Sequence, residues 1–314
     1  ATHHTNEARG FHAPGTTGPF GGAVAVGKLL GFGAAKMTNA LGIAGSLSCG
    51  LLEFAKSGTG AMVKRLHLGR AAESGVLAAS LAADGFTGPQ SVLEGQFGFL
   101  RVFCTEFDEG ELTRGLGESW VTRTILMKRF ACHISAHTSV QAILDLRAEH
   151  GFAGADVAAI RIAGNEKMAK VNNIPSPRDV MMCQYSIPFS VALAHFRDPR
   201  DPRSYDESAL NDPAIRSLCE RVTITLAGGD HDHATIAAEV EVTLRDGRVL
   251  NKTVADFKGT PEQPLEQADL RERFMLLTRH CRAADMERLF ARLQNIENET
   301  SLDWLAVEAA AKAA

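Results

Sequence analysis

Four side chains that carry or can accept a positive charge lie close together in GAMVKRLHLGRAAESG, residues 60–75: Lys64, Arg65, His67 and Arg70. The whole chain has a net charge of −4, so this concentration of positive charge is local. Fixed cations bind carboxylates or phosphates, and an imidazole exchanges protons near neutral pH. The spacing therefore predicts a site that holds a small anion and moves protons on it.

Two further segments repeat this combination. In GFHAPGTTGPFGG, residues 10–22, His12 stands beside a proline and several glycines just before a helical pattern. In LMKRFACHISAHTSVQAI, residues 126–143, Lys128 precedes two histidines. We expect His12, Lys64 and Lys128 each to lie at a helix start, where backbone N–H groups add to the positive field. The three segments thus share one feature, a cation or an imidazole at a helix start.

Each of these features has a plainer interpretation. Lys64 and Arg70 would also suit a solvated helix face. GAVAVGKL, residues 22–29, has P-loop spacing but ends in Leu29 instead of Ser or Thr, and no strand precedes it, which argues against nucleotide binding. His133 and His137 share a helix face as zinc ligands do, but no third ligand is evident. We therefore expect one functional and one packed histidine there, no metal, and a solvated turn at His231 and His233.

Length and composition describe an ordinary globular protein. The 314 residues are 45% hydrophobic and 22% charged, which is enough for two domains. The pI near 6.3 argues against a general nucleic-acid binder. The six cysteines lack metal or cluster spacing and are interpreted as reduced thiols. The longest uncharged stretch, residues 37–52, is too short and polar to span a bilayer, and no secretory signal is evident, so the expected location is cytoplasmic.

Hydrophobic periodicity divides the chain into regions of different character. Residues 18–85 are rich in small residues with helical spacing, which predicts a compact helical bundle. Alternating β-branched residues predict strands at 157–164, 221–228 and 234–254, the last folded into a hairpin at Asp246-Gly247. Helical patterns lie among the strands, at 135–150, 179–196 and 212–220.

Helical periodicity returns after Lys258-Gly259. The predicted fold class is therefore mostly α with an α+β part. We expect a discontinuous helical domain built from residues 1–122 and 260–314, and a smaller α/β lid domain over residues 123–259.

Five motifs identify a family resemblance. GFHAPGTTGPFG, NALGIAGSLSCGLLEF, KRLHLGRAAESGVLAA, MKRFACHISAH and YSIPFSVALAH together resemble the MmgE/PrpD family, in order from Gly10 to about Phe274. That family includes 2-methylcitrate dehydratase, cis-aconitate decarboxylase and iminodisuccinate epimerase. The resemblance implies a helical domain with an α/β lid, and a homodimer. It implies catalytic roles for His12, Lys64 and Lys128, which are therefore predicted to converge on one cleft between the two domains. The candidate substrate-binding residues are Arg65, His67, His137 and Tyr185.

The resemblance also implies the chemistry. Family substrates are small polycarboxylates, whose charged groups need fixed cations in a pocket of low dielectric constant. We expect a metal-independent lyase without a cofactor, in first place a hydro-lyase that dehydrates an acid such as 2-methylcitrate. An isomerase or epimerase and a decarboxylase are the alternatives. The expected partner is the polycarboxylate itself, with no nucleic acid and no membrane.

Two departures from the family pattern bear on these expectations. Family members carry a helical segment before the G-F-H motif, with an Asp and a His of the active site, so the helical domain is expected to be N-terminally incomplete. Cis-aconitate decarboxylase has a catalytic Tyr in the segment that matches SIPF, where this chain has Phe189. Phe189 speaks against decarboxylation, although Tyr185 lies nearby. The incomplete domain also allows a rival hypothesis, in which the chain is a non-catalytic carboxylate-binding or structural remnant.

Overall fold

The computed structural model describes residues 1–2, 5–55, 62–228 and 236–305. The chain divides into two units. Unit 1 comprises residues 1–121 and 178–182, and unit 2 comprises residues 122–177 and 183–314. Each unit is described by itself below.

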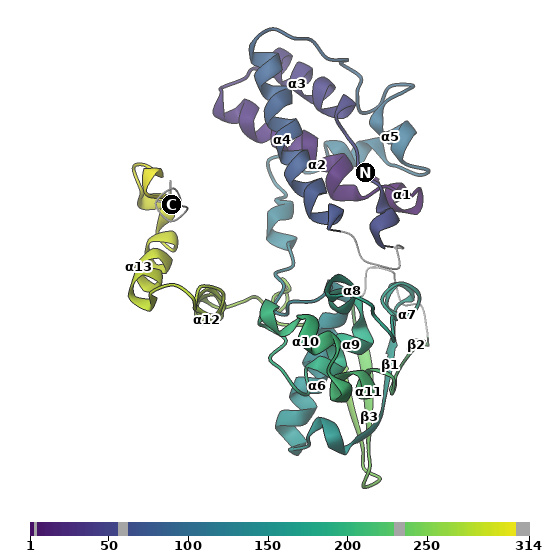
Figure 1. Ribbon diagram of the computed structural model, residues 1–314. Helices are drawn as coiled ribbons and strands as arrows, with labels where there is room; N and C mark the ends of the chain where they lie inside the picture. Colours follow the sequence, from purple (N-terminus) through teal and green to yellow (C-terminus); the bar gives the residue numbers. More distant parts are fainter. Residues whose placement is uncertain (3–4, 56–61, 229–235, 306–314) are drawn as a thin grey trace. The chain divides into compact units, whose positions relative to one another are not determined.

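Unit 1 is helical, as its sequence pattern predicts. Its elements are α1 (Thr5–Ala8), α2 (Ala13–Leu29), α3 (Ala34–Ser46), the 3-10 turn η1 (Leu52–Ala55), α4 (Val63–Ala83), α5 (Phe99–Phe103) and the 3-10 turn η2 (Glu109–Leu112). Helices α2, α3 and α4 lie against one another (Figure 1). Their shared core is made mainly of small side chains, among them Ala23, Ala40, Ile43, Ala44, Ala78 and Ala82.

Helices α2 and α4 come close together at two glycines. A Cβ atom placed on Gly75 of α4 would lie 2.5 Å from the Cα atom of Gly22 on α2. One turn along, a Cβ atom on Gly18 would lie 2.8 Å from that of Ala71. Such separations leave no room for a side chain at Gly75, so backbone packs directly on backbone. This contact fixes the position of α4, which carries Lys64 and His67, relative to α2, which begins at His12.

Unit 2 contains a four-stranded mixed sheet in the order β2-β1-β3-β4. Strand β1 (Val157–Gly164) pairs in parallel with β2 (Val222–Leu226) and antiparallel with β3 (Ala238–Leu244), which forms a hairpin with β4 (Val249–Val254). The predicted hairpin turn is confirmed: Gly247 has a φ of +91°, which favours glycine, and the Leu244 N–H donates to the Arg248 carbonyl at 2.8 Å. Along β3, Ala238, Val240, Val242 and Leu244 are buried.

Helices and 3-10 turns make up the rest of unit 2. They are η3 (Val121–Thr124), η4 (Ile134–Ala136), α6 (His137–His150), η5 (Gly154–Asp156), α7 (Glu166–Lys170), α8 (Val180–Tyr185), α9 (Ile187–Leu193), η6 (Pro202–Ser204), α10 (Glu207–Leu210), α11 (Pro213–Cys219), α12 (Gln267–Leu277), α13 (Ala283–Leu293), η7 (Ile296–Asn298) and η8 (Asp303–Leu305). Two of these elements cross the division, because residue 121 of η3 and residues 180–182 of α8 are grouped with unit 1. Helix α6 packs on β3 and β4, and α9 contacts α6, α11 and β2 (Figure 1). The fold is therefore mostly helical with a small α/β part, as the sequence predicts.

The long helix predicted over 179–196 is divided in two. Ser186 caps α9: its hydroxyl accepts a hydrogen bond from the Phe189 N–H at 2.9 Å and donates to the Ile174 carbonyl at 2.6 Å. Pro188 in the first turn of α9 cannot extend the preceding helix, because proline has no backbone N–H. The break separates Tyr185, at the end of α8, from Phe189.

Helices α12 and α13 belong to unit 2 by their contacts. Nη1 of Arg273 donates to the Arg129 carbonyl at 3.1 Å, and Nη2 of Arg203 donates to the Leu276 carbonyl at 3.0 Å. Phe274 and Phe290 join the two helices, with ring centroids 5.4 Å apart. The discontinuous domain that would group residues 260–314 with residues 1–122 stays a prediction.

Candidate functional site

The start of α2 is held by a short irregular segment of unit 1. The His12 N–H donates to the Gly50 carbonyl at 3.0 Å, and the Leu52 N–H donates to the Gly10 carbonyl at 2.8 Å. His12 is the residue immediately before α2, so its predicted place at a helix start is confirmed. Gly50 has a φ of +137°, and a Cβ atom there would lie 3.4 Å from Nδ1 of His67. Gly50 therefore lets the backbone contact both histidines.

His12 and His67 form a pair. Their Nδ1 atoms are 3.0 Å apart, and the Phe54 ring meets both imidazoles edge to face. His12 is buried, with 6% of its surface exposed, and His67 is half-buried. Burial first, and then the neighbouring His67 and Lys64, lower the pKa of His12 from 6.5 to about 4. His12 is therefore a neutral imidazole at pH 7.

Lys64 lies in the first turn of α4, as predicted, and is half-buried. Burial is the largest influence on its pKa, which is lowered; Arg65 lowers it further and Glu7 of α1 opposes both. Arg65 itself is exposed. Arg70 is also exposed and forms an ion pair with Glu73 at 2.7 Å. The basic stretch thus divides into a half-buried lysine beside His12 and a solvated arginine one helical turn after His67.

Unit 2 holds a second set of predicted residues. Its central group is His133, which caps η4: its Nδ1 accepts a hydrogen bond from the Ser135 N–H at 3.3 Å, which places the proton of the neutral ring on Nε2. The His133 N–H donates to the Gln184 carbonyl at 2.7 Å. The Tyr185 ring lies 5.0 Å from that of His133, and burial raises the pKa of Tyr185 to about 12. Tyr185 is therefore a protonated phenol at neutral pH.

His137 is fully buried in the core of unit 2. Its Nε2 accepts a hydrogen bond from the Phe130 N–H at 3.2 Å, and its Nδ1 donates to the His133 carbonyl at 3.2 Å. The rings of Phe130 and Phe257 flank it, and burial is the main reason why its pKa is lowered to about 3. The substrate contact predicted for His137 stays a prediction, and this placement speaks against it.

Lys128 is exposed, in the segment between η3 and η4. The prediction that it lies at a helix start is wrong, because residues 125–128 belong to no helix. The neighbouring Met127 instead donates its N–H to the Gly259 carbonyl at 2.7 Å. Lys128 nevertheless lies close enough to His137 for its charge to help lower the pKa of that imidazole.

The structure thus gathers the predicted residues into two sets. His12, Lys64, Arg65 and His67 lie together in unit 1, and Lys128, His137 and Tyr185 lie in unit 2 with His133. The convergence of His12, Lys64 and Lys128 stays a prediction. The sequence analysis named His137 of its pair as the candidate site residue, whereas the structure leaves His133 the more exposed of the two. The available signal was register: His137 continues the buried face of α6 with Val140, whereas His133 precedes the helix.

The structure also bears on the P-loop-like stretch and on metal binding, both of which the sequence argues against. Residues 22–29 lie within α2, so the P-loop-like stretch forms no loop. Within the residues that the structure describes, no three His, Cys, Asp or Glu side chains are grouped so that they could hold a metal ion. His231 and His233 lie outside the described residues. Over the same described part of the chain, no helix combines the length and apolar character that a membrane crossing requires.

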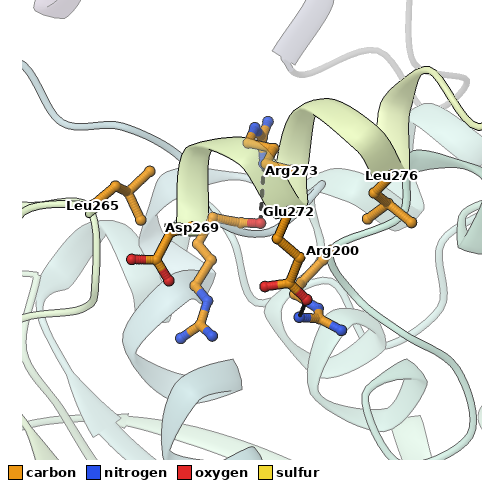
Figure 2. Close-up of a pocket in the computed structure, with 7 residues that line it drawn as sticks. Arg200, Leu265, Asp269, Glu272, Arg273 and Leu276 are labelled. Carbon is orange, nitrogen blue, oxygen red and sulfur yellow. Dashed lines mark hydrogen bonds and ion pairs between the residues drawn. The ribbon is translucent and has the colours of Figure 1, made fainter. Parts of the chain in front are cut away.

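A small pocket lies where α12 meets the rest of unit 2 (Figure 2). It is lined by Arg129, Arg200, Leu265, Asp269, Glu272, Arg273 and Leu276. Arg200 pairs with Glu272 at 2.5 Å, and Asp269 pairs with Lys258 at 2.7 Å. The other two arginines donate to neutral oxygens: Arg129 to Oε1 of Gln141 and Arg273 to the Arg129 carbonyl, both at 3.1 Å. None of the predicted site residues lines it, so we interpret it as part of the α12 packing contact.

Comparison with known proteins identifies the family. The MmgE/PrpD N-terminal domain matches residues 1–111, and the MmgE/PrpD C-terminal domain matches residues 130–296.

Three relatives show how far the likeness extends. Human cis-aconitate decarboxylase is 30% identical over 297 residues, which is 92% of this chain and 60% of the human protein. Cis-aconitate decarboxylase of Aspergillus terreus is 29% identical over 93% of this chain and 64% of its own length. 2-Methylcitrate dehydratase of Cupriavidus necator is 29% identical over 44% of this chain and 31% of its own length. The chain thus spans less than two thirds of the length of these relatives. The two domain matches, in order along the chain, show that it belongs to the MmgE/PrpD family.

Proposed function

We propose that this chain is a lyase that acts on a small polycarboxylate, in first place a hydro-lyase for a hydroxy tricarboxylate such as 2-methylcitrate. The observation that carries the proposal is the buried, neutral His12 beside the half-buried cation Lys64. A lone pair on an imidazole can remove a proton from carbon, and a fixed cation can hold the carboxylate next to that carbon. Family membership supports a substrate of this class.

His12 is assigned the role of base, and Lys64 the role of carboxylate anchor. In dehydration the C–H electron pair forms the double bond, the proton passes to Nε2 of His12, and the C–O bond breaks. The leaving hydroxide takes a proton from an acid and departs as water. Lys64 stabilises the negative charge that builds up beside the carboxylate. No metal or cofactor is needed for this sequence of steps.

The pKa of His12 in the free protein is low for a base, and an anionic substrate would raise it. A base works best when its pKa is near the working pH, and about 4 is too low for that. A bound tricarboxylate brings negative charge next to His12, which offsets Lys64 and raises the pKa of His12. The base is thereby strengthened when the substrate is present.

The residues of unit 2 enter the proposal through the family resemblance. Lys128 is proposed as a second catalytic cation, and Tyr185 as a group that donates a hydrogen bond or proton to the same substrate. The phenol of Tyr185 stays protonated at neutral pH, which a donor requires. Arg65 and His67 were predicted to bind substrate, and Arg65 keeps that role here. The proposed state is a homodimer in the cytoplasm, which light scattering and fractionation would test.

Decarboxylation of a compound such as cis-aconitate is the second candidate. It is favoured by the names of the relatives that match more than nine tenths of the chain. Phe189 weighs against it: its side chain has no hydroxyl and is fully buried in the core of unit 2. Epimerisation of a related dicarboxylate is the third candidate, and no contact among the described residues favours it.

Product analysis separates these reactions. The protein is incubated with 2-methylcitrate, citrate and cis-aconitate in excess EDTA, and the products are identified by mass spectrometry. Loss of water from a hydroxy acid is expected, and loss of carbon dioxide from cis-aconitate would instead establish the second candidate. Binding of these acids without any turnover would favour the hypothesis that the chain is a non-catalytic carboxylate-binding protein. If neither binding nor turnover occurs, the proposed function is wrong.

A further inference from the structure

The contact between the Nδ1 atoms of His12 and His67 requires a particular arrangement of protons. At 3.0 Å this is a hydrogen bond, so one Nδ1 atom carries the proton and the other accepts it. If both rings are neutral, each has only one N–H group. The ring that donates from Nδ1 therefore has a lone pair on Nε2, and the ring that accepts has its proton on Nε2.

We propose that His67 is a positioning residue whose Nδ1 accepts a hydrogen bond from the Nδ1–H of His12, so that the lone pair of His12 is held on Nε2. This inference rests on the proposed function, in which Nε2 of His12 is the base. It replaces the substrate-binding role that the sequence suggested for His67. His67 then acts through His12 and not on the substrate.

The direction of the hydrogen bond follows from what happens when His12 accepts a proton. Protonated His12 has N–H groups at both ring positions, so it can keep the bond only if His67 is the acceptor. In the opposite arrangement the Nδ1–H of His67 would face a new N–H, and the contact would become repulsive. Only the proposed direction lets the pair remain intact throughout a cycle of proton uptake and release.

The charged neighbours fit a neutral acceptor. The charge of Lys64, on the same helix as His67, lowers the pKa of His12, and the charges of Glu7 and Arg65 act in turn on Lys64. The Phe54 ring of η1 packs edge to face with both imidazole rings. A carboxylate in the place of His67 would hold protonated His12 strongly and would compensate Lys64. A neutral imidazole orients His12 without adding negative charge beside it, so His12 gives its proton up readily.

Two variants of His67 distinguish orientation from packing. In His67→Asn, the side-chain carbonyl oxygen stands close to the position of Nδ1 and can accept from His12. His67→Ala removes the acceptor. His280→Asn, at an exposed histidine in unit 2, is the matched control. Thermal unfolding of all three variants establishes that they are folded before any other comparison.

Nitrogen-15 NMR of the full chain with labelled histidine measures the proton positions without any substrate, and His12→Asn assigns the His12 signals. The wild-type chain is expected to show a protonated Nδ1 and an unprotonated Nε2 on His12. His67→Ala is expected to convert His12 to a mixture of tautomers, and His67→Asn to restore the wild-type pattern. An unprotonated Nδ1 on His12 in the wild-type chain, or an unchanged pattern in His67→Ala, would overturn the inference.

Steady-state kinetics on the acid identified by product analysis give the second measurement. For His67→Ala we expect kcat to fall roughly 10- to 100-fold, the size of effect seen when the partner that orients a metal-bound imidazole is removed, with KM changed less than about twofold. His67→Asn should recover most of kcat. A rise in KM with kcat unchanged would overturn the inference and make His67 a substrate contact. The wild-type NMR pattern together with no turnover of any acid would contradict the proposed function alone.

Discussion

The carbonyl of His133 accepts a hydrogen bond from Nδ1 of His137 at 3.2 Å, so the two histidines of CHISAH are joined although their surroundings differ. His137 also accepts from the Phe130 N–H and is fully buried, whereas His133 is half-buried beside Tyr185. Both ring nitrogens of His137 are thus used to hold the backbone ahead of α6. The buried imidazole positions the segment that carries the more accessible one.

Replacing His137 by Phe should destabilise unit 2. The Phe130 N–H would lose its acceptor in a buried place, which typically costs about 1–3 kcal/mol. His195→Phe is the matched comparison, because His195 is also buried but neither of its ring nitrogens has a hydrogen-bond partner among the described residues. That variant should gain about 1 kcal/mol at pH 7. Chemical denaturation measures both, and equal effects of the two substitutions would contradict the assigned hydrogen bonds.

The same two histidines predict sensitivity to acid. Burial lowers the pKa of His137 and of His195 to about 3, against 6.5 in an unfolded chain. Between pH 6.5 and 3 the unfolded state therefore binds protons that the native state does not, so the free energy of unfolding falls as the pH is lowered through that range. The gain from His195→Phe should be about 2 kcal/mol larger at pH 5 than at pH 7. A gain that does not depend on pH would show that His195 titrates normally in the native state.

The glycine contact between α2 and α4 predicts contrasting effects of alanine. Gly75→Ala would place its Cβ atom 2.5 Å from Cα of Gly22, so the helices must separate, at a cost of about 1–3 kcal/mol. Gly21→Ala meets no atom within 4 Å and should stabilise α2 by about 0.5–1 kcal/mol. Chemical denaturation compares the two, and a neutral Gly75→Ala would mean that the helices are not in contact there.

Much of this arrangement could be predicted from the sequence, for identifiable reasons. Alternating residues located β1 and the β3–β4 hairpin because one face of the sheet is buried, and the small residues of α2 and α4 indicated a close helix contact. Helix starts were correct for His12 and Lys64, which directly precede or open long helical patterns. Lys128 was misplaced because the pattern after it is interrupted by the η4 turn, and a basic pair looks the same in a loop.

Other features needed coordinates. The pairing of His12 with His67 depends on how α4 lies against α2, which no local pattern reports. The choice between His133 and His137 depends on burial, because the two residue types are identical. The break at Ser186 depends on the contact of its hydroxyl with the distant Ile174 carbonyl, which the helical pattern over 179–196 does not report.

Two cations on α4 should differ in their effect on ligand binding. Lys64→Ala removes a half-buried charge beside His12 and should weaken binding of a tricarboxylate by about 2 kcal/mol or more. Arg70→Ala removes an exposed charge already paired with Glu73, and it should leave the binding affinity nearly unchanged. Isothermal titration calorimetry gives both values. Equal effects would indicate a general surface potential and not a site at Lys64.

Ligand binding should raise the pKa of His12. The free protein holds this pKa at about 4, through burial and then His67 and Lys64. A tricarboxylate with neither a hydroxyl group nor a carbon–carbon double bond cannot react. When bound, it would add negative charge beside the imidazole and favour its protonated form. An NMR titration of the His12 ring with and without this ligand measures the shift. A pKa that stays unchanged at full occupancy would place the ligand away from His12.

The central claim is that His12 removes a proton from carbon next to a carboxylate. It is tested most directly by proton NMR in deuterated water, with the hydroxy tricarboxylate that the wild-type chain turns over. The account predicts that the signal of the carbon-bound proton disappears with the wild-type chain, through reaction or exchange with solvent, and persists with His12→Asn while the folded variant still binds the acid. Loss of that signal at the wild-type rate in His12→Asn would contradict the account.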